Sequence, residues 1–146
     1  MMVDTIREIM TSKVITYEHK DNVQNAARKM RDNFISCLIV LRHGSPVGIV
    51  TERDIVYRLV SKNLDPTKIL IKDIMSTPLK SVNPDESVYY ASRIMITNHI
   101  KKLPVVKKGK LIGVVTQTDL ANYFARQRKD FIFENLRKSI KAAYPV

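Results

Sequence analysis

The sequence predicts an α/β (α+β) fold: two copies of a β-α-β-β-α unit, packed sheet to sheet about a pseudo-twofold axis, followed by a C-terminal helix. Two observations carry this prediction. Sixteen positions of residues 6–61 hold the same residue 65 positions later, without a gap. The phrase VGIVTERD at 47–54 also recurs as IGVVTQTD at 112–119. Such self-similarity at one fixed offset indicates a duplicated structural unit.

Each copy contains a central amphipathic helix followed by two short strands and a second helix. Apolar residues recur at helical spacing in 23–30 and 88–95. Two apolar runs follow, 36–41 with 46–51 and 102–106 with 111–116, joined by turns that contain Gly44 and Gly109. Because three strands and two helices leave one sheet face half covered, we expect the copies to bury a joint core.

The chain divides into repeat 1 (3–62), a linker (63–69), repeat 2 (70–126) and a basic tail (127–146). In the tail, Phe133, Leu136, Ile140 and Ala143 form one helical stripe, which predicts an amphipathic helix. Residues 126–146 hold six Lys/Arg against two Asp/Glu. Docking on a partner subunit is the favoured role, with packing on its own repeats or on nucleic acid or a membrane surface as alternatives.

Composition excludes several classes of protein. No apolar run approaches the roughly 18–20 residues of a membrane span, and no signal peptide is evident, so a cytoplasmic location is expected. Cys37 is the one cysteine, and His19, His43 and His99 lack acidic or thiol partners in sequence, so no metal site is expected. Nucleophile elbows and Walker loops are missing, so no catalytic residues are expected and the chain is not predicted to be an enzyme.

The repeated T-x-x-D words have two interpretations. Thr51 with Asp54, and Thr116 with Asp119, match a capping box at the start of a helix. A helix N-terminus also offers amides and a positive dipole end to phosphate, and a carboxylate there can accept the hydroxyls of a ribose diol. Capping and binding are compatible, because a carboxylate has several acceptor positions.

The tandem order, the repeated phrase and the L-P-V-V strand at 103–106 resemble a pair of cystathionine-β-synthase (CBS) domains. The pair is often called a Bateman module, here of the stand-alone prokaryotic or archaeal type, and the resemblance covers roughly residues 3 to 126. It implies a flat module with two clefts that take adenosine compounds such as AMP, ADP, ATP or S-adenosylmethionine. No cofactor would be required beyond such an adenine nucleotide ligand.

By this resemblance, Asp54 and Asp119 would hold ribose, while Thr51 and Thr116 would bond ribose or phosphate. Other implied ligand contacts form three groups: backbone at Val14, Ile15, Thr16 and at Leu79, Lys80, Ser81; apolar walls at Ile35 and Ile100; and phosphate-binding cations at Lys101 and Lys102. The first repeat has Ser36 and Cys37 where the second has these lysines, and Arg53 is expected to compensate. The clefts should therefore differ. For each cation, a solvated surface charge is the alternative.

The sequence thus predicts a non-catalytic regulatory module that senses cellular energy by binding adenine nucleotides and signals to an unknown protein partner. A homodimer is expected, because apolar residues such as Ile55, Leu59, Tyr90 and Ile94 should face outward. The alternative is a basic nucleic-acid-binding protein that uses the CBS pair as a dimerising scaffold. A third alternative is a subunit that serves an enzyme in trans.

Overall fold

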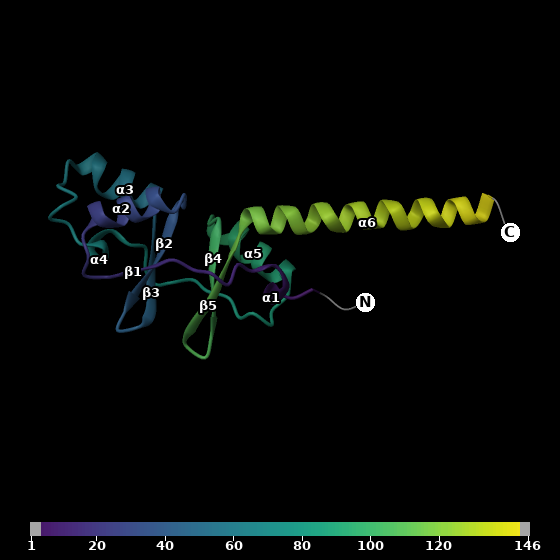
Figure 1. Cartoon of the computed structure of the whole chain (residues 1–146), viewed down its shortest axis with the longest axis horizontal. Helices are drawn as coiled ribbons and strands as arrows, with labels where there is room; N and C mark the ends of the chain where they lie inside the picture. Colours follow the sequence, from purple (N-terminus) through teal and green to yellow (C-terminus); the bar gives the residue numbers. More distant parts are fainter. Residues whose placement is uncertain (1–3, 144–146) are drawn as a thin grey trace.

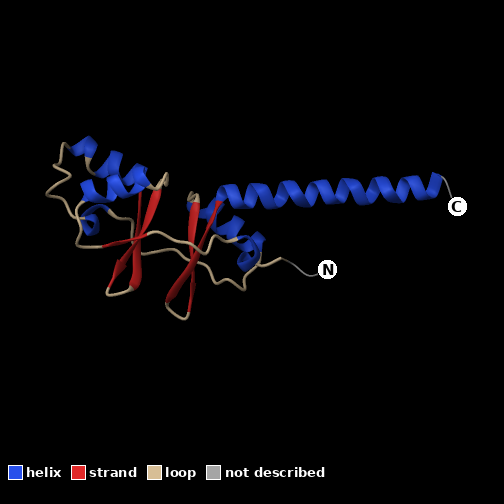
Figure 2. Ribbon diagram, in the orientation of Figure 1, coloured by secondary structure: helices blue, strands red, loops and turns tan. Residues whose placement is uncertain are grey.

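The computed structural model describes residues 4–143, with side chains through residue 138, and confirms the α/β fold with two related units. Figures 1 and 2 show two small sheets side by side, flanked by helices, with one long helix extending from the second unit. The elements are α1 (Ile6–Ile9), β1 (Thr16–Glu18), α2 (Val23–Asp32), β2 (Cys37–Arg42), β3 (Ser45–Thr51), α3 (Glu52–Arg58), the 3₁₀ turn η1 (Val60–Lys62), α4 (Ile71–Ile74), α5 (Val88–Asn98), β4 (Lys102–Lys107), β5 (Lys110–Thr116) and α6 (Gln117–Ala143).

The two sheets differ in their first strand. In the first unit, β1 pairs parallel to β2, and β2 pairs antiparallel to β3. In the second unit, β4 and β5 form an antiparallel pair, and the first strand is reduced to a bridge between Val82 and Val105. His19 extends the first ladder by donating its amide to Leu41 O, at 3.0 Å. The equivalent position, 65 residues later, is Pro84, which has no N–H, so the ladder ends there.

Both hairpins turn at the glycines that the sequence singled out, Gly44 and Gly109. His43 and Gly44 have φ of 50° and 78°, and Lys108 and Gly109 have φ of 50° and 76°. Two successive positive φ values define the type I′ turn, which matches the twist of antiparallel strands and favours glycine at its second position. The predicted strand–turn–strand order is confirmed in both units.

The short helices α1 and α4 are exchanged between the units. Ile6 of α1 is buried with residues of the second unit, such as Val88 and Val115, whereas Ile71 and Ile74 of α4 are buried with the first unit. Most buried apolar residues therefore form two clusters, one for each sheet with its helices. The sheets also meet, because β3 lies against β5, and Ile39 of β2 is buried outside both clusters. The crossing segments thus complete each cluster, in addition to the predicted packing of sheet on sheet.

The repeated glycines permit this exchange. A Cβ at Gly48 would lie 2.8 Å from Met75 Sδ, and a Cβ at Gly113 would lie 2.8 Å from Met10 Sδ and 2.9 Å from the carbonyl oxygen of Thr11. All three distances are shorter than real Cβ contacts, so the segments after α1 and α4 fit against β5 and β3 only over glycine. The glycine of the repeated phrase therefore serves packing.

Helix α6 continues without a break past residue 126 and projects away from both units (Figure 1). Four large apolar residues on this projection are about half exposed or more: Phe131, Ile132, Phe133 and Leu136. The predicted helical stripe is present at Phe133 and Leu136, while the side chains of Ile140 and Ala143 lie outside the described residues. One expected alternative was that the tail packs on its own repeats. In this single chain it does not.

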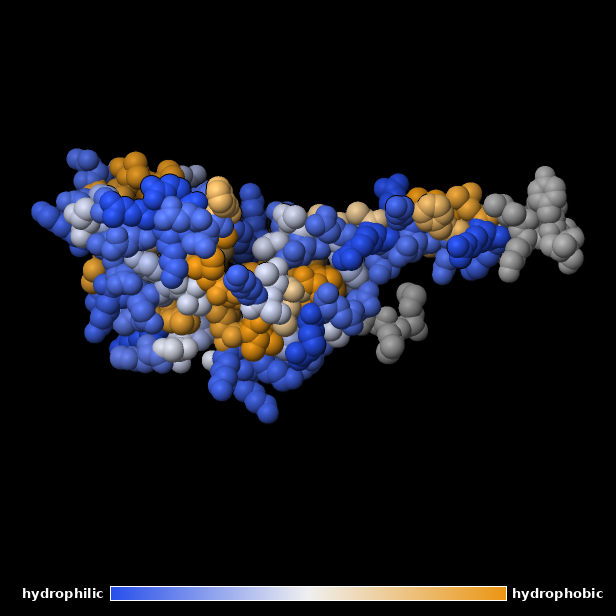
Figure 3. Space-filling model, viewed as in Figure 1, coloured by the Kyte–Doolittle hydropathy of each residue, from blue (hydrophilic) through white to orange (hydrophobic). Residues whose placement is uncertain are grey.

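The outward apolar surface is not made by the residues named from the sequence. Leu59 is buried, and Ile55 and Ile94 pack against the two clusters, so Tyr90 alone of the four is exposed. This happens because the helices turn these residues toward the sheets. The exposed large apolar residues on the helices of the two units, or in the turn directly after α2, are Phe34, Val56, Tyr57, Val60, Tyr89, Tyr90 and Ile96. Figure 3 shows apolar areas over α3 and along α6.

No helix in residues 4–143 is long and apolar enough to cross a membrane.

Candidate functional site

Both T-x-x-D words fold into capping boxes. Thr51 N and Thr51 Oγ1 donate to Asp54 Oδ2 at 2.9 and 3.1 Å, and Asp54 N donates back to Thr51 Oγ1 at 3.3 Å. Thr116 and Asp119 repeat this pattern at 2.8, 2.9 and 3.1 Å. The local pattern therefore fixes one carboxylate oxygen, Oδ2, in each unit. Whether each carboxylate can bind a ligand depends on the contacts of its other oxygen, Oδ1.

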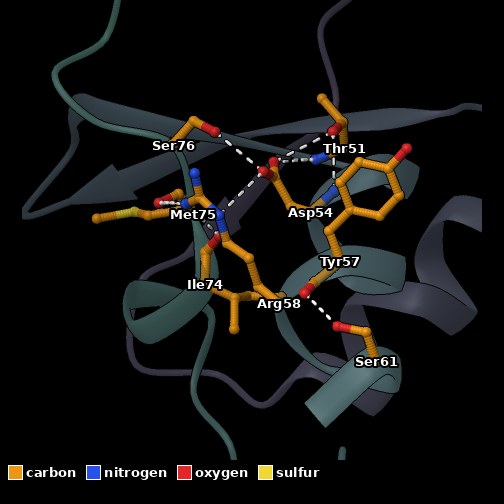
Figure 4. A network of polar contacts seen from close by, with 8 residues as sticks. All are labelled: Thr51, Asp54, Tyr57, Arg58, Ser61, Ile74, Met75 and Ser76. Atoms are coloured by element: carbon orange, nitrogen blue, oxygen red, sulfur yellow. Dashed lines mark hydrogen bonds and ion pairs between the residues drawn. The ribbon is translucent and has the colours of Figure 1, made fainter.

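In the first unit, the second oxygen of Asp54 is already occupied. Ser76 Oγ donates to Asp54 Oδ1 at 3.0 Å, and Arg58 Nε lies 3.8 Å from the same oxygen (Figure 4). Arg58 Nη1 also donates to the carbonyl oxygens of Ile74 and Met75, at 3.1 and 3.0 Å, and so caps the end of α4. Asp54 is 6% exposed, so it is a buried carboxylate with a hydrogen bond on each oxygen.

In the second unit, the equivalent carboxylate keeps an unoccupied oxygen. The positions that correspond to Ser76 and Arg58 are Thr11 and Tyr123. The Tyr123 ring is buried in the apolar cluster of the second unit. Burial, together with Asp4, raises the pKa of the Tyr123 hydroxyl to about 12. No described residue donates a hydrogen bond to Asp119 Oδ1, and Asp119 is half-buried. This oxygen can accept two hydrogen bonds from a ligand.

The helix amides leave little room for phosphate. Glu52 N donates to Ser36 O at 3.1 Å, and Gln117 N donates to Lys101 O at 2.8 Å, so the first amide of each helix is satisfied by the strand before it. The third amide is used by the capping threonine. Any phosphate nearby would therefore depend mainly on cationic side chains.

Lys102 crosses from the second unit to the first. Its Nζ donates to Ser36 Oγ, just before β2, and it lies near Cys37. Burial raises the pKa of the Cys37 thiol, and the ammonium of Lys102 offsets this in part. Lys102 is therefore the cation that lies beside Ser36 and Cys37 of the first unit. Arg53 is exposed, with its guanidinium carbon 5.4 Å from the centroid of the Tyr57 ring.

An open groove of about 650 Å³ lies beside this junction. It is mostly apolar, and its lining includes Met30, Phe34, Ile35, Ser36, Glu52, Ile55, Val56 and Lys102. The structure therefore brings three of the predicted residues, Ile35, Ser36 and Lys102, onto one surface.

The remaining predicted residues are more scattered. Thr16 begins β1, and its carbonyl oxygen already accepts from Lys29 Nζ at 2.8 Å. Ser81 is exposed, and no described residue bonds its hydroxyl. Ile100 packs against the apolar cluster of the second unit, and Lys101 is exposed next to α6. Among the described residues, no hydrogen bond links Thr16 or Ser81 to either carboxylate.

Two site residues were missed from the sequence, Ser76 and Arg58. Each differs from its counterpart at the 65-residue offset, Thr11 and Tyr123, but most other positions of the repeats differ as well, so the difference is no specific signal. Arg58 follows Asp54 by four residues on α3, a spacing that could have indicated the ion pair. The contact of Ser76 with Asp54 was not readable, since Ser76 is 22 residues away.

The histidines do not assemble a metal site in the part of the chain that the structure describes, where no group of three or more ligand side chains is found. His19 is buried at the end of β1 with its Nδ1 unbonded, 6.3 Å from His43 between ring centroids. His99 ends α5 with a φ of 53°.

Comparison with known proteins places this architecture in a family. The model of the CBS domain matches residues 6–61 and 71–126. Protein MK0525 of Methanopyrus kandleri is 38% identical over 118 residues, which are 80% of this chain and 60% of that protein. The chain thus spans about three fifths of that relative's length.

Two solved structures are similar in fold. The CBS domain pair of protein MJ0100, in complex with 5-methylthioadenosine and S-adenosyl-L-methionine, superposes with a TM-score of 0.77 at 26% identity, over 86% of this chain and 99% of that one. The hexameric CBS-CP12 protein from bloom-forming cyanobacteria has a TM-score of 0.77 at 32% identity, over 98% of this chain and 85% of that one. With two matched copies, the repeated fold and these relatives, the chain belongs to the CBS-domain family.

Proposed function

We propose that this CBS pair is a regulatory module that binds an adenosine-containing ligand, with the Asp119 carboxylate as the ribose acceptor. The observation that carries this proposal is the unoccupied Oδ1 of a half-buried carboxylate, whose Oδ2 is held in place by Thr116. Support also comes from the CBS pair of MJ0100, whose structure contains two adenosine compounds.

The chemistry suits a vicinal diol. The Thr116 bonds immobilise the carboxylate, and Oδ1 can then accept both ribose hydroxyls. Charge-assisted hydrogen bonds of this kind are about twice as strong as those between neutral groups. Lys101 is a candidate for the phosphate charge of a nucleotide, because it is exposed just before β4 and its carbonyl oxygen accepts from Gln117 N, the first amide of the helix that carries Asp119. Lys102, the other lysine predicted for this role, reaches toward Ser36 of the first unit.

The proposed role is regulatory, and no catalytic step is assigned to the chain. The segments 11–16 and 76–82 cross between the units, because each begins beside one sheet and ends beside the other. A ligand that binds one relative position of the units better than another shifts their equilibrium by its difference in affinity. That shift would change the surface offered to a protein partner and so report nucleotide levels.

We further propose that the chain self-associates. Exposed apolar side chains on α3, α5 and α6 support this, because contiguous apolar patches of more than a few hundred Å² are rare on monomers. The hexameric CBS-CP12 protein, whose similarity extends over 98% of this chain, also supports an assembly.

Isothermal titration calorimetry with AMP, ADP, ATP and S-adenosylmethionine tests the ligand proposal. Asp119→Asn should weaken the best ligand by about 10- to 150-fold, which corresponds to the roughly 1.5–3 kcal/mol of hydrogen bonds to a charged group. Asp130→Asn, on the exposed part of α6, is the matched control and should bind as the wild type does. Unchanged affinity in Asp119→Asn, Asp54→Asn and the double variant would reject the ribose assignment and leave only the capping role.

A further inference from the structure

We infer that the two units are functionally unequal: Asp119 is the ligand-binding carboxylate, whereas Asp54 is a structural latch that joins α3 to the segment after α4. Resting on the proposed function, this inference predicts one ligand per chain.

Asp54 has too few free acceptor positions to take both hydroxyls of a diol, because three hydrogen bonds already reach its two oxygens. Its Oδ2 accepts twice from Thr51, and its Oδ1 accepts from Ser76 and faces Arg58. A ligand at this carboxylate would have to displace Ser76 Oγ and the Arg58 pair, and would gain only equivalent bonds in return. The carboxylate is also buried, so a ligand reaches it only after these residues move.

The backbone is the same around both carboxylates, so the difference lies in side chains. Ser76 exchanges backbone hydrogen bonds with Ile49, at 2.8 and 3.2 Å, and Thr11 exchanges them with Val114, at 2.9 Å each. Thr11 therefore occupies the place of Ser76 beside the second carboxylate. Its side chain is exposed, and no hydrogen bond from its hydroxyl to Asp119 is formed.

Arg58 completes the latch. It binds the last carbonyls of α4 as well as Asp54, so it ties together segments that come from the two repeats in sequence (Figure 4). In the second unit, Tyr123 turns into the hydrophobic cluster and leaves the carboxylate open. Both copies of the motif thus cap a helix, but among the described residues only the copy in the second unit keeps a free acceptor oxygen.

Calorimetric titration of the full chain with AMP, ATP and S-adenosylmethionine as probes gives the test. The wild type should bind one ligand per chain, Asp119→Asn should lose at least 10-fold in affinity, and Asp54→Asn should keep one site. The double variant Ser76→Ala/Arg58→Gln frees the Asp54 carboxylate without removing it, and should gain a second, weaker site.

Two equal sites in the wild type, or loss of the single site in Asp54→Asn with retention in Asp119→Asn, would overturn the inference and leave the proposed function standing. Absence of binding by every probe would overturn both. Because the wild-type stoichiometry needs no variant, the inference stays testable even if Asp54→Asn fails to fold, which circular dichroism would reveal.

Discussion

Removal of Asp54 should destabilise the protein by about 2 kcal/mol more than removal of Asp119. Both Asp→Ala changes break a capping box, which costs about 1 kcal/mol each. Asp54→Ala also removes the bond from Ser76, a hydrogen bond to a charged group worth about 1.5 kcal/mol at the lower end of its range. The ion pair with Arg58, whose side chain is 47% exposed, adds only about 0.5 kcal/mol after allowance for solvent screening.

Urea denaturation without ligand, followed by circular dichroism at one fixed protein concentration, measures this difference. The expected losses are about 3 kcal/mol for Asp54→Ala and about 1 kcal/mol for Asp119→Ala, by the same estimates. The corresponding difference in melting temperature is about 4–8 °C for a chain of this size. Ser76→Ala should account for most of the excess when measured alone.

Equal losses in the two variants would refute the reasoning. Such a result would mean that the bonds from Ser76 and Arg58 to Asp54 contribute nothing beyond the local capping box, and the proposed latch would lose its energetic basis. An increase in the denaturant m-value alone would point instead to a changed unfolded state.

Four further outcomes are expected. Gly113→Ala should lower the free energy of unfolding by about 1–3 kcal/mol, because the new Cβ overpacks against Met10 and the Thr11 backbone. Urea denaturation of the double variant with Met10→Ala should show only part of this loss restored, since the Thr11 oxygen remains 2.9 Å away. Burial, with Asp21, raises the pKa of Tyr17 to about 12, so its contribution to stability is complete below about pH 10. That contribution should be lost as the pH rises toward 12, and Tyr17→Phe should flatten this alkaline decline in thermal scans. Light scattering at micromolar concentration should give about twice the 16.8 kDa chain mass or a higher multiple, and a monomer would contradict self-association. Duplex DNA should bind only at about the 10⁻⁴ to 10⁻⁶ M level, whereas sub-micromolar, sequence-preferring binding lost on removal of residues 127–146 would favour the nucleic-acid alternative.

The sequence by itself determined the features that depend on near neighbours along the chain. The duplication, the amphipathic helices α2 and α5, the two glycine turns and both capping boxes follow from spacings of a few residues. In each case the interacting groups lie within one turn of helix or one hairpin, so local patterns are sufficient.

Only the tertiary structure decided how the two copies differ. The exchange of α1 and α4, the burial of Leu59, the bond from Ser76 to Asp54 and the bonds from Arg58 to the end of α4 depend on which distant segments meet. The sequence offered no rule for that choice. Asp54 and Asp119 are identical in their local motif, yet Asp54 has both oxygens engaged, whereas Asp119 Oδ1 has no hydrogen bond from a described residue. The physical reason is that a carboxylate's second oxygen takes whatever donor the fold brings to it, here a serine 22 residues further along the chain.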